Sequence, residues 1–357
     1  MLLDQLDGIG RVVLLGDAIE LRQGPLREAF AAARPFFEAL GEKLGADGEV
    51  ILVPGNHDHL LVAPWLERRH RDAAPPPLEL AETAAWEPHD PVAALAEWLA
   101  PARFTLAYPG VWLRDDVYAT HGHFLDRHTT VPTFERLGAG AMGRLVGALP
   151  SSGVGPDDYE AALAPIYAWI DALAQNAGEH AQGTHGASAR AWRTLAAAGD
   201  RSPLRRRVLT GLFPFGIAAI NRAGIGPLRA DLSGEELRRA GVRAMGETVR
   251  ALEIPAAYVI FGHTHRAGPR PGDDSADWSV GDTHLLNSGC WVYEPSFAGT
   301  APYASPYWPG VGIVVEEEFP LAPPESRRML EGHSSADLRT PRDGDGAARP
   351  LRPRRPA

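Results

Sequence analysis

The sequence contains a single cysteine, Cys290, in 357 residues. One thiol forms neither an intrachain disulfide nor a thiolate metal cluster, so folding does not require an oxidising compartment. Any metal ion must therefore be held by histidine, aspartate, asparagine or glutamate side chains. Lysine is also scarce, because Lys43 is the only one, and we interpret this bias as genome composition rather than function.

Long hydrophobic runs and an excess of positive charge are absent as well. The longest apolar stretch, residues 208–220, is broken by Pro214 and falls short of the about 20 residues that a membrane-spanning helix needs. The net charge of −10 is unfavourable for a surface that binds nucleic acid. The opening residues carry acids where a secretory signal is basic and apolar. We therefore expect a cytoplasmic protein, either freely diffusing or peripheral at the membrane.

Apolar runs of strand length recur, and each ends in a polar cluster. Residues 11–15 and 50–54 are predicted strands, separated by a helix with one apolar stripe over residues 25–44. Parallel strands joined in this way place the following loops at one edge of a sheet, where ligand sites gather. The predicted fold class is therefore α/β.

The pattern along the rest of the sequence divides the whole chain into four predicted segments. Residues 116–120 and 256–261 repeat the pattern of a strand followed by polar residues, whereas the chain between them is rich in alanine and leucine and predicts helices. We expect a core in two parts, residues 1–130 and 255–324, with a helical cap insertion over 131–254 and a disordered tail over 325–357.

Histidines concentrate at the ends of the predicted strands. Imidazole and oxygen donors suit Zn²⁺, Mn²⁺ or Fe, and the donors at these positions are Asp17, Asn56, His121, His263 and His265. Side chains two apart on a strand point to the same face, so we expect His263 and His265 to face one pocket.

Four motifs, in this order, carry a resemblance to a known family. The segments GDAIE (16–20), GNHDH (55–59), THGH (120–123) and GHTH (262–265) resemble those of the calcineurin-like metallophosphoesterase superfamily, over roughly residues 10–320. The layout is most similar to the UDP-2,3-diacylglucosamine pyrophosphatase branch. The resemblance implies a four-layer α/β/β/α sandwich with a helical cap.

The resemblance also implies a centre with two divalent ions. Asp17 would bridge both ions, Asn56, His121 and His263 would complete one site, and His265 would belong to the other. Two ions about 3.5–4 Å apart clamp a phosphoryl group and activate a hydroxide that attacks phosphorus.

The same resemblance assigns roles beside the ions. His57 would contact the phosphate and protonate the leaving oxygen, and Asp58 would orient His57. His123 and Arg266 are candidates for contact with the substrate phosphate, with a structural role as the equal alternative.

One family motif is missing. No Asp-x-His stands before Asp17, so one or two ions are expected. Either the true start lies upstream, which we favour, or one metal site has been lost. We favour the upstream start because the crossover would otherwise begin halfway and leave the sheet without a central strand and with an unpaired edge.

The expected function is a phosphohydrolase that cleaves a phosphoester or phosphoanhydride bond in a small substrate linked to a nucleotide or a lipid. Glu20-Leu21 stands where phosphoprotein phosphatases have Asp-Arg, which argues against that branch. The alternatives are a phosphodiesterase for cyclic or other nucleotides and a degenerate binding protein with little turnover.

Overall fold

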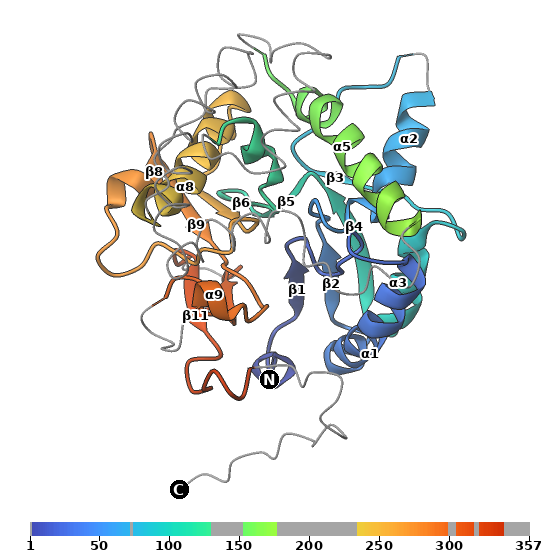
Figure 1. Ribbon diagram of the computed structural model, residues 1–357, viewed down its shortest axis with the longest axis horizontal. Helices are drawn as coiled ribbons and strands as arrows, with labels where there is room; N and C mark the ends of the chain where they lie inside the picture. Colours follow the sequence, from blue (N-terminus) through green and yellow to red (C-terminus); the bar gives the residue numbers. More distant parts are fainter. Residues whose placement is uncertain are drawn as a thin grey trace, which may run out of the picture.

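The computed structural model describes residues 2–71, 74–129, 153–176, 234–298, 305–317 and 321–338. In this part of the chain, strands form sheets of four, five and two members, with helices beside them (Figure 1). The larger sheets contain both parallel and antiparallel pairs, which confirms the α/β class.

The four-stranded sheet carries the first two motifs. Its order is β1-β2-β4-β3, formed by Arg11–Leu14, Glu49–Leu52, Arg103–Tyr108 and Glu82–Thr83, respectively. The first three of these strands are parallel, and β3 is antiparallel to β4. One face packs against helices α1 (Leu26–Leu44), α2 (Ala63–Arg71) and α3 (Pro91–Trp98). The predicted strand, helix and strand over residues 11–54 are therefore confirmed.

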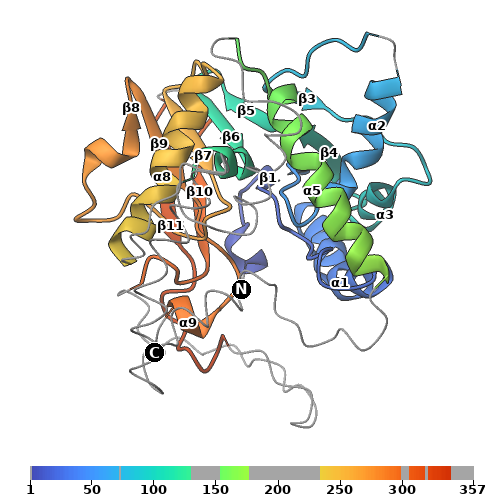
Figure 2. The ribbon, with the colours of Figure 1, turned by 45° about the horizontal axis from the view of Figure 1, so that its top comes forward.

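The five-stranded sheet carries the other two motifs. Its order is β5-β6-β7-β9-β8, formed by Gly110–Arg114, Val117–Thr120, Tyr258–Phe261, Thr283–Asn287 and Ser279–Val280, respectively. The central strands β6, β7 and β9 are parallel, and the edge strands are antiparallel to their neighbours. Helix α8 (Gly234–Ala251) packs on one face, as Figure 2 shows.

Alternation along the strands gives both sheets two apolar faces. Val50 of β2 belongs to the cluster beneath α1, whereas the adjacent Ile51 belongs to a second cluster on the other face. In the five-stranded sheet, Val259 packs with α8 and Ile260 packs on the opposite side. Leu15 packs against both of the clusters that face away from the helices.

Two segments differ from the predicted boundaries. Helix α8 lies within the predicted cap but packs against the sheet, because its residues Val242 and Met245 belong to the sheet's own buried cluster. Helix α5 (Pro156–Asn176) contacts instead the short helices η2 (His59–Leu61) and η3 (His123–Arg127). The rest of the predicted cap, residues 130–152 and 177–233, lies outside the described residues.

The predicted tail begins with a strand. Residues Glu325–Arg328 form β11, antiparallel to β10 (Val311–Val314), so the expected disorder from residue 325 is wrong here. The sequence does not predict this strand, because its residues are polar and form no apolar pattern. Backbone hydrogen bonds to β10 hold it in place. Residues 339–357 lie outside the described part. The smaller helices are η1 (Leu3–Gln5), η6 (Ser275–Trp278) and α9 (Pro295–Ala298).

Strand β1 has one unpaired edge within the described residues. It pairs with β2 and with no other described strand, in line with the expected open edge. A depression of about 1890 Å³ follows this edge, lined by β1 on one side and β10 on the other. Asp17, His121, His263 and His265 also line it, so four of the five predicted metal ligands border the same space.

The described helices also bear on membrane insertion. None of them combines the length and the apolar character needed to cross a lipid bilayer.

Candidate metal centre

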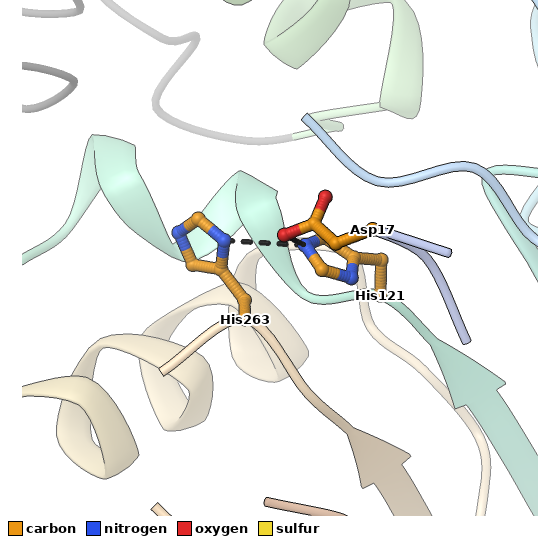
Figure 3. Close-up of side chains that lie close together, drawn as sticks. All are labelled: Asp17, His121 and His263. Carbon is orange, nitrogen blue, oxygen red and sulfur yellow. Dashed lines mark hydrogen bonds and ion pairs between the residues drawn. The ribbon is translucent and has the colours of Figure 1, made fainter. Parts of the chain in front are cut away.

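Four loops bring the predicted ligands together at the carboxyl ends of four strands. Asp17 follows β1, Asn56 follows β2, His121 follows β6 and His263 follows β7. β1 and β2 end at one edge of the four-stranded sheet, and β6 and β7 end at one edge of the five-stranded sheet, so loops from both sheets meet here. Asp17, His121 and His263 each offer a ligand atom within 4.8 Å of the others, so these three residues could hold a metal ion (Figure 3).

Asn56 adds a fourth oxygen to this group. Its Oδ1 lies 3.1 Å from His263 Nδ1 and 3.3 Å from His121 Nε2. Those two ring nitrogens lie 3.3 Å apart, and His121 Nε2 lies 3.3 Å from Asp17 Oδ2. We call Asp17, Asn56, His121 and His263 the four-ligand cluster.

The hydrogen bonds behind the cluster decide which nitrogen faces it. His121 Nδ1 lies 2.9 Å from the carbonyl oxygen of Leu15, which only accepts, so this nitrogen carries the hydrogen and Nε2 presents a lone pair. His263 Nε2 lies 3.1 Å from both carboxylate oxygens of Asp126, which assigns the lone pair to His263 Nδ1.

The cluster therefore directs acceptor atoms at one another. Two imidazole lone pairs, an amide oxygen and a carboxylate repel unless a cation or a proton lies between them. Although burial opposes a charged ring, the negative Asp17 raises the pKa of His121. A proton and a metal ion would compete for this place, and the oxygen and imidazole donors fit a divalent transition metal.

Close backbone packing builds the cluster. A Cβ atom at Gly55 would lie 2.7 Å from His121 Nε2 and would collide with Asp17 Oδ1. Asp17 and His263 have φ angles of 52° and 63°, which residues other than glycine seldom adopt. Such conformations persist where the surroundings determine them and are frequent at functional sites.

His265 lies outside the cluster. Strand β7 ends at Phe261, and both His263 and His265 have left-handed backbone angles, with φ of 63° and 59°. The alternation of strand side chains does not apply to such a loop, so the argument that placed both rings on one strand face is wrong. His265 is exposed and borders the depression beside β1.

His57 lies next to the cluster and pairs with a glutamate. Its backbone N–H donates to Asp17 Oδ1 at 2.9 Å, and its ring Nδ1 lies 2.7 Å from Glu20 Oε2. Burial disfavours a charged ring, but Asp17 and the hydrogen bond to Glu20 outweigh it and raise the pKa of His57 to about 9. Both carboxylates therefore favour the charged form of this imidazole.

Asp58 has a different role from the predicted one. Its buried carboxylate accepts hydrogen bonds from the backbone N–H groups of Gly55, Ala18 and Asp17, at 2.6, 2.8 and 3.2 Å. Burial beside the negative Asp17 raises the pKa of Asp58 to about 6. Asp58 thus ties two ligand loops together, and Glu20 is the residue that orients His57.

His123 is buried behind the cluster. It is 1% exposed, and its Nε2 lies 3.1 Å from the hydroxyl of Tyr108, which donates to Glu160 on α5. His59 Nε2 lies 3.2 Å from the other oxygen of Glu160. These four residues form a buried polar network between α5 and the core, so His123 does not reach a substrate in this conformation.

Arg266 is also buried, with 7% exposed. Its Nη2 donates to Asp273 at 2.8 Å, and its guanidinium lies 4.9 Å from the centre of the Trp278 ring. These contacts support the structural alternative for Arg266 rather than contact with phosphate.

Two carboxylates beside the predicted site were not assigned a role from the sequence, Glu20 and Asp126. Glu20 stands three residues after Asp17, and this spacing was the available signal for a partner of His57. Asp126 lies in the segment His121–His128, five residues after a predicted ligand, and this closeness was the available signal.

Comparisons with known proteins give no relative for this chain. No protein-family model matches it, and neither a curated protein nor a solved structure matches it.

Proposed function

We propose that this protein is a metal-dependent phosphohydrolase of the calcineurin-like metallophosphoesterase type. The two faces of each large sheet support the proposal. Helices cover one face, and a cluster of apolar residues lies on the other. Leu15 and Val111 pack against both of the clusters on those second faces. This arrangement fits a four-layer α/β/β/α sandwich, with α5 as part of a helical cap.

One observation carries the proposed chemistry, namely an imidazole paired with the carboxylate of Glu20 beside a group of converging acceptors. Asp17 links the two, since one carboxylate oxygen lies 3.3 Å from His121 Nε2 and the other accepts from the backbone of His57. A cation site next to a proton donor is what cleavage of a phosphate ester requires.

Each residue has a task in this reaction. A divalent ion held by the four-ligand cluster would supply Lewis acidity toward the phosphoryl oxygens and would make water more acidic. His57 would bind a phosphate oxygen through its charge and donate its proton to the leaving oxygen. Glu20 would keep the ring of His57 turned and charged, and Asp58 would hold the loops in register through backbone hydrogen bonds.

The net charge of the protein bears on the class of substrate. A protein with a net charge of −10 repels a polyanion such as nucleic acid, whereas a small phosphodiester or phosphoanhydride presents few charges. We therefore propose a small phosphorylated substrate.

Hydrolysis of bis-p-nitrophenyl phosphate in the presence of Mn²⁺ tests the proposal. We expect His57→Ala to lower kcat by about 10²–10⁴-fold, since general acid catalysis contributes that much. Glu20→Gln should reduce the rate less, because it leaves the imidazole in place. His89→Ala is the matched control, since the side chain of His89 is 77% exposed.

The outcome that contradicts the proposal is equally specific. Turnover that survives in His57→Ala, with metal binding unchanged, would remove His57 from the mechanism.

A second function has one observation in its favour. The described residues complete a single cluster, while His265 stands apart from it, so the centre resembles half of a two-ion site. A protein that binds phosphorylated molecules with little turnover would need no more. Binding of inorganic phosphate that depends on Mn²⁺, without hydrolysis of the ester, would identify this second function.

A further inference from the structure

Asp126 lies behind the four-ligand cluster and contacts only one of its rings. It is 4% exposed and lies in helix η3, five residues after His121. Gly122, with a φ angle of 100°, turns the chain between the two, and a Cβ there would lie 3.2 Å from Phe261. A single short segment therefore provides one ligand, His121, and the carboxylate that holds another, His263.

The two histidines of the cluster are held in different ways. The ring of His121 donates from Nδ1 to a backbone carbonyl, so it presents Nε2. The ring of His263 lies against a carboxylate at Nε2, so it presents Nδ1. The backbone carbonyl is present whatever the side chain, whereas the carboxylate depends on residue 126.

We propose that Asp126 is a positioning residue that selects Nδ1 of His263 as the ligand atom and strengthens metal binding. The inference rests on the metal centre of the proposed function. It does not depend on turnover, because it concerns only how the ring is held.

Two physical effects give Asp126 this role. A carboxylate that accepts the Nε2 hydrogen keeps the hydrogen on that nitrogen, which leaves the lone pair of Nδ1 for the metal. The negative charge also makes the imidazole a stronger electron donor. Both carboxylate oxygens lie at 3.1 Å from Nε2, so they hold the ring from both sides of the hydrogen.

A rotation of the ring would remove this ligand atom. Turning His263 by about 180° around its Cβ–Cγ bond puts Cδ2 where Nδ1 was, and imidazole torsions of this kind are broad and roughly two-fold. Without the carboxylate, either Nδ1 or Cδ2 could face the cluster. Asp126 thus favours one of the two ring orientations of His263, namely the one in which Nδ1 faces the cluster.

Metal affinity in variants of Asp126 is the first test. We expect Asp126→Ala to raise the Kd for Mn²⁺ and for Co²⁺ by about 10–100-fold, the usual effect of removing an outer partner of a ligand histidine. Asp126→Asn should fall between, because its amide oxygen still accepts from Nε2. Asp90→Asn is the matched control, since Asp90 is a buried acid that precedes α3 and pairs with Arg68 of α2.

The ligand atom is the second test, and a merely structural role would not change it. With ¹⁵N-labelled histidine and ¹¹³Cd²⁺, the unaltered protein should show coupling of the ion to Nδ1 of His263. Asp126→Ala should lose that coupling or reduce it, whereas Asp90→Asn should keep it.

Several results would overturn the inference. These are an unchanged Kd in both Asp126 variants, coupling through Nδ1 that persists in Asp126→Ala, or no metal binding by the unaltered protein. If Asp126→Ala does not fold, Asp126→Asn decides through the same two measurements. Metal binding that follows the expected order without ester hydrolysis supports Asp126 while refuting the proposed phosphohydrolase.

Discussion

His263 and His265 are two residues apart, but their surroundings differ. His263 is backed by a buried carboxylate at 3.1 Å and faces two other ligand atoms at 3.1 and 3.3 Å. His265 is exposed at the border of the depression beside β1. We call the four-ligand cluster together with Asp126 the closed side of the centre, and we call the surroundings of His265 the open side.

The difference shows what makes a histidine a ligand. Both rings follow the same strand, and both have left-handed backbone angles, so neither residue type nor local conformation separates them. What differs is the support from segments distant in sequence, since the fixed ring of His263 loses little freedom on binding an ion. The closed side is built before a metal arrives, and the open side is not.

The largest expected effect compares the two histidines directly. His263→Ala should weaken Mn²⁺ binding by more than about 100-fold, because losing an outer partner alone costs about 10–100-fold. His265→Ala should weaken it by less than about tenfold, the lower limit for such a partner. Isothermal titration of both variants gives the ratio. Equal losses would show that the open side contributes as much as the closed side.

A methyl group placed inside the closed side is the next test. Gly55→Ala should lower the free energy of unfolding by about 1–3 kcal/mol, the usual range for overpacking, and should abolish metal binding. Its Cβ would lie 2.7 Å from His121 Nε2. Gly10→Ala, where nothing lies within 4 Å of the added atom, is the control.

Urea denaturation with and without Mn²⁺ measures both effects of this change. If Gly55→Ala bound the metal normally, the cluster would have room to relax and would not be preformed.

Much of the closed side could be predicted from the sequence because it depends on strand ends. Buried parallel strands are short continuous apolar runs, so residues 11–15, 50–54 and 116–120 stood out, and each contains or overlaps an observed strand. The residues that follow β1 and β2 lie at one edge of the four-stranded sheet, which is why Asp17 and Asn56 come together. His121 follows β6 of the five-stranded sheet, so its place beside them depends on how the two sheets pack and not on a shared edge.

The partners of these residues could not be predicted in the same way. Glu20 and Asp58 are both acids close to His57 in the motifs, and only the folded loops show which one reaches the ring. The carboxylate of Asp58 accepts hydrogen bonds from three backbone N–H groups, so Glu20 is the acid that pairs with the ring of His57. Burial is the second obstacle, because the sequence shows a polar residue at 123 and not the network that encloses it.

The network behind the closed side should respond to acid. Burial lowers the pKa of His123 from 6.5 to about 4, so its neutral form stabilises the fold above pH 6.5, and this contribution is lost as the pH falls toward 4. His59 and His123 overcome the effect of burial and hold the pKa of Glu160 well below its usual range. That contribution is lost at lower pH, once the carboxyl protonates.

Urea denaturation of the metal-free protein between pH 7 and pH 4.5 checks this sign. The unfolding free energy should fall by up to about 1.4 kcal/mol per pH unit for the proton on His123. His123→Gln should make the dependence shallower, whereas His89→Gln, at an exposed position, should not. A steeper dependence in His123→Gln would contradict the assignment.

The smallest effect concerns the ion pair beside the open side. Arg11 of β1 binds Glu317, which follows β10, at 2.7 Å, and also binds Glu49 at 2.8 Å. The side chain of Glu317 is 55% exposed, so Arg11→Gln should lower the free energy of unfolding by less than about 1 kcal/mol, and added salt should reduce the difference. Arg34→Gln, which removes an exposed pair with Glu38 on α1, is the control. A loss well above that of Arg34→Gln would mean that side chains hold β10 near β1, and the open side would then be as firmly built as the closed one.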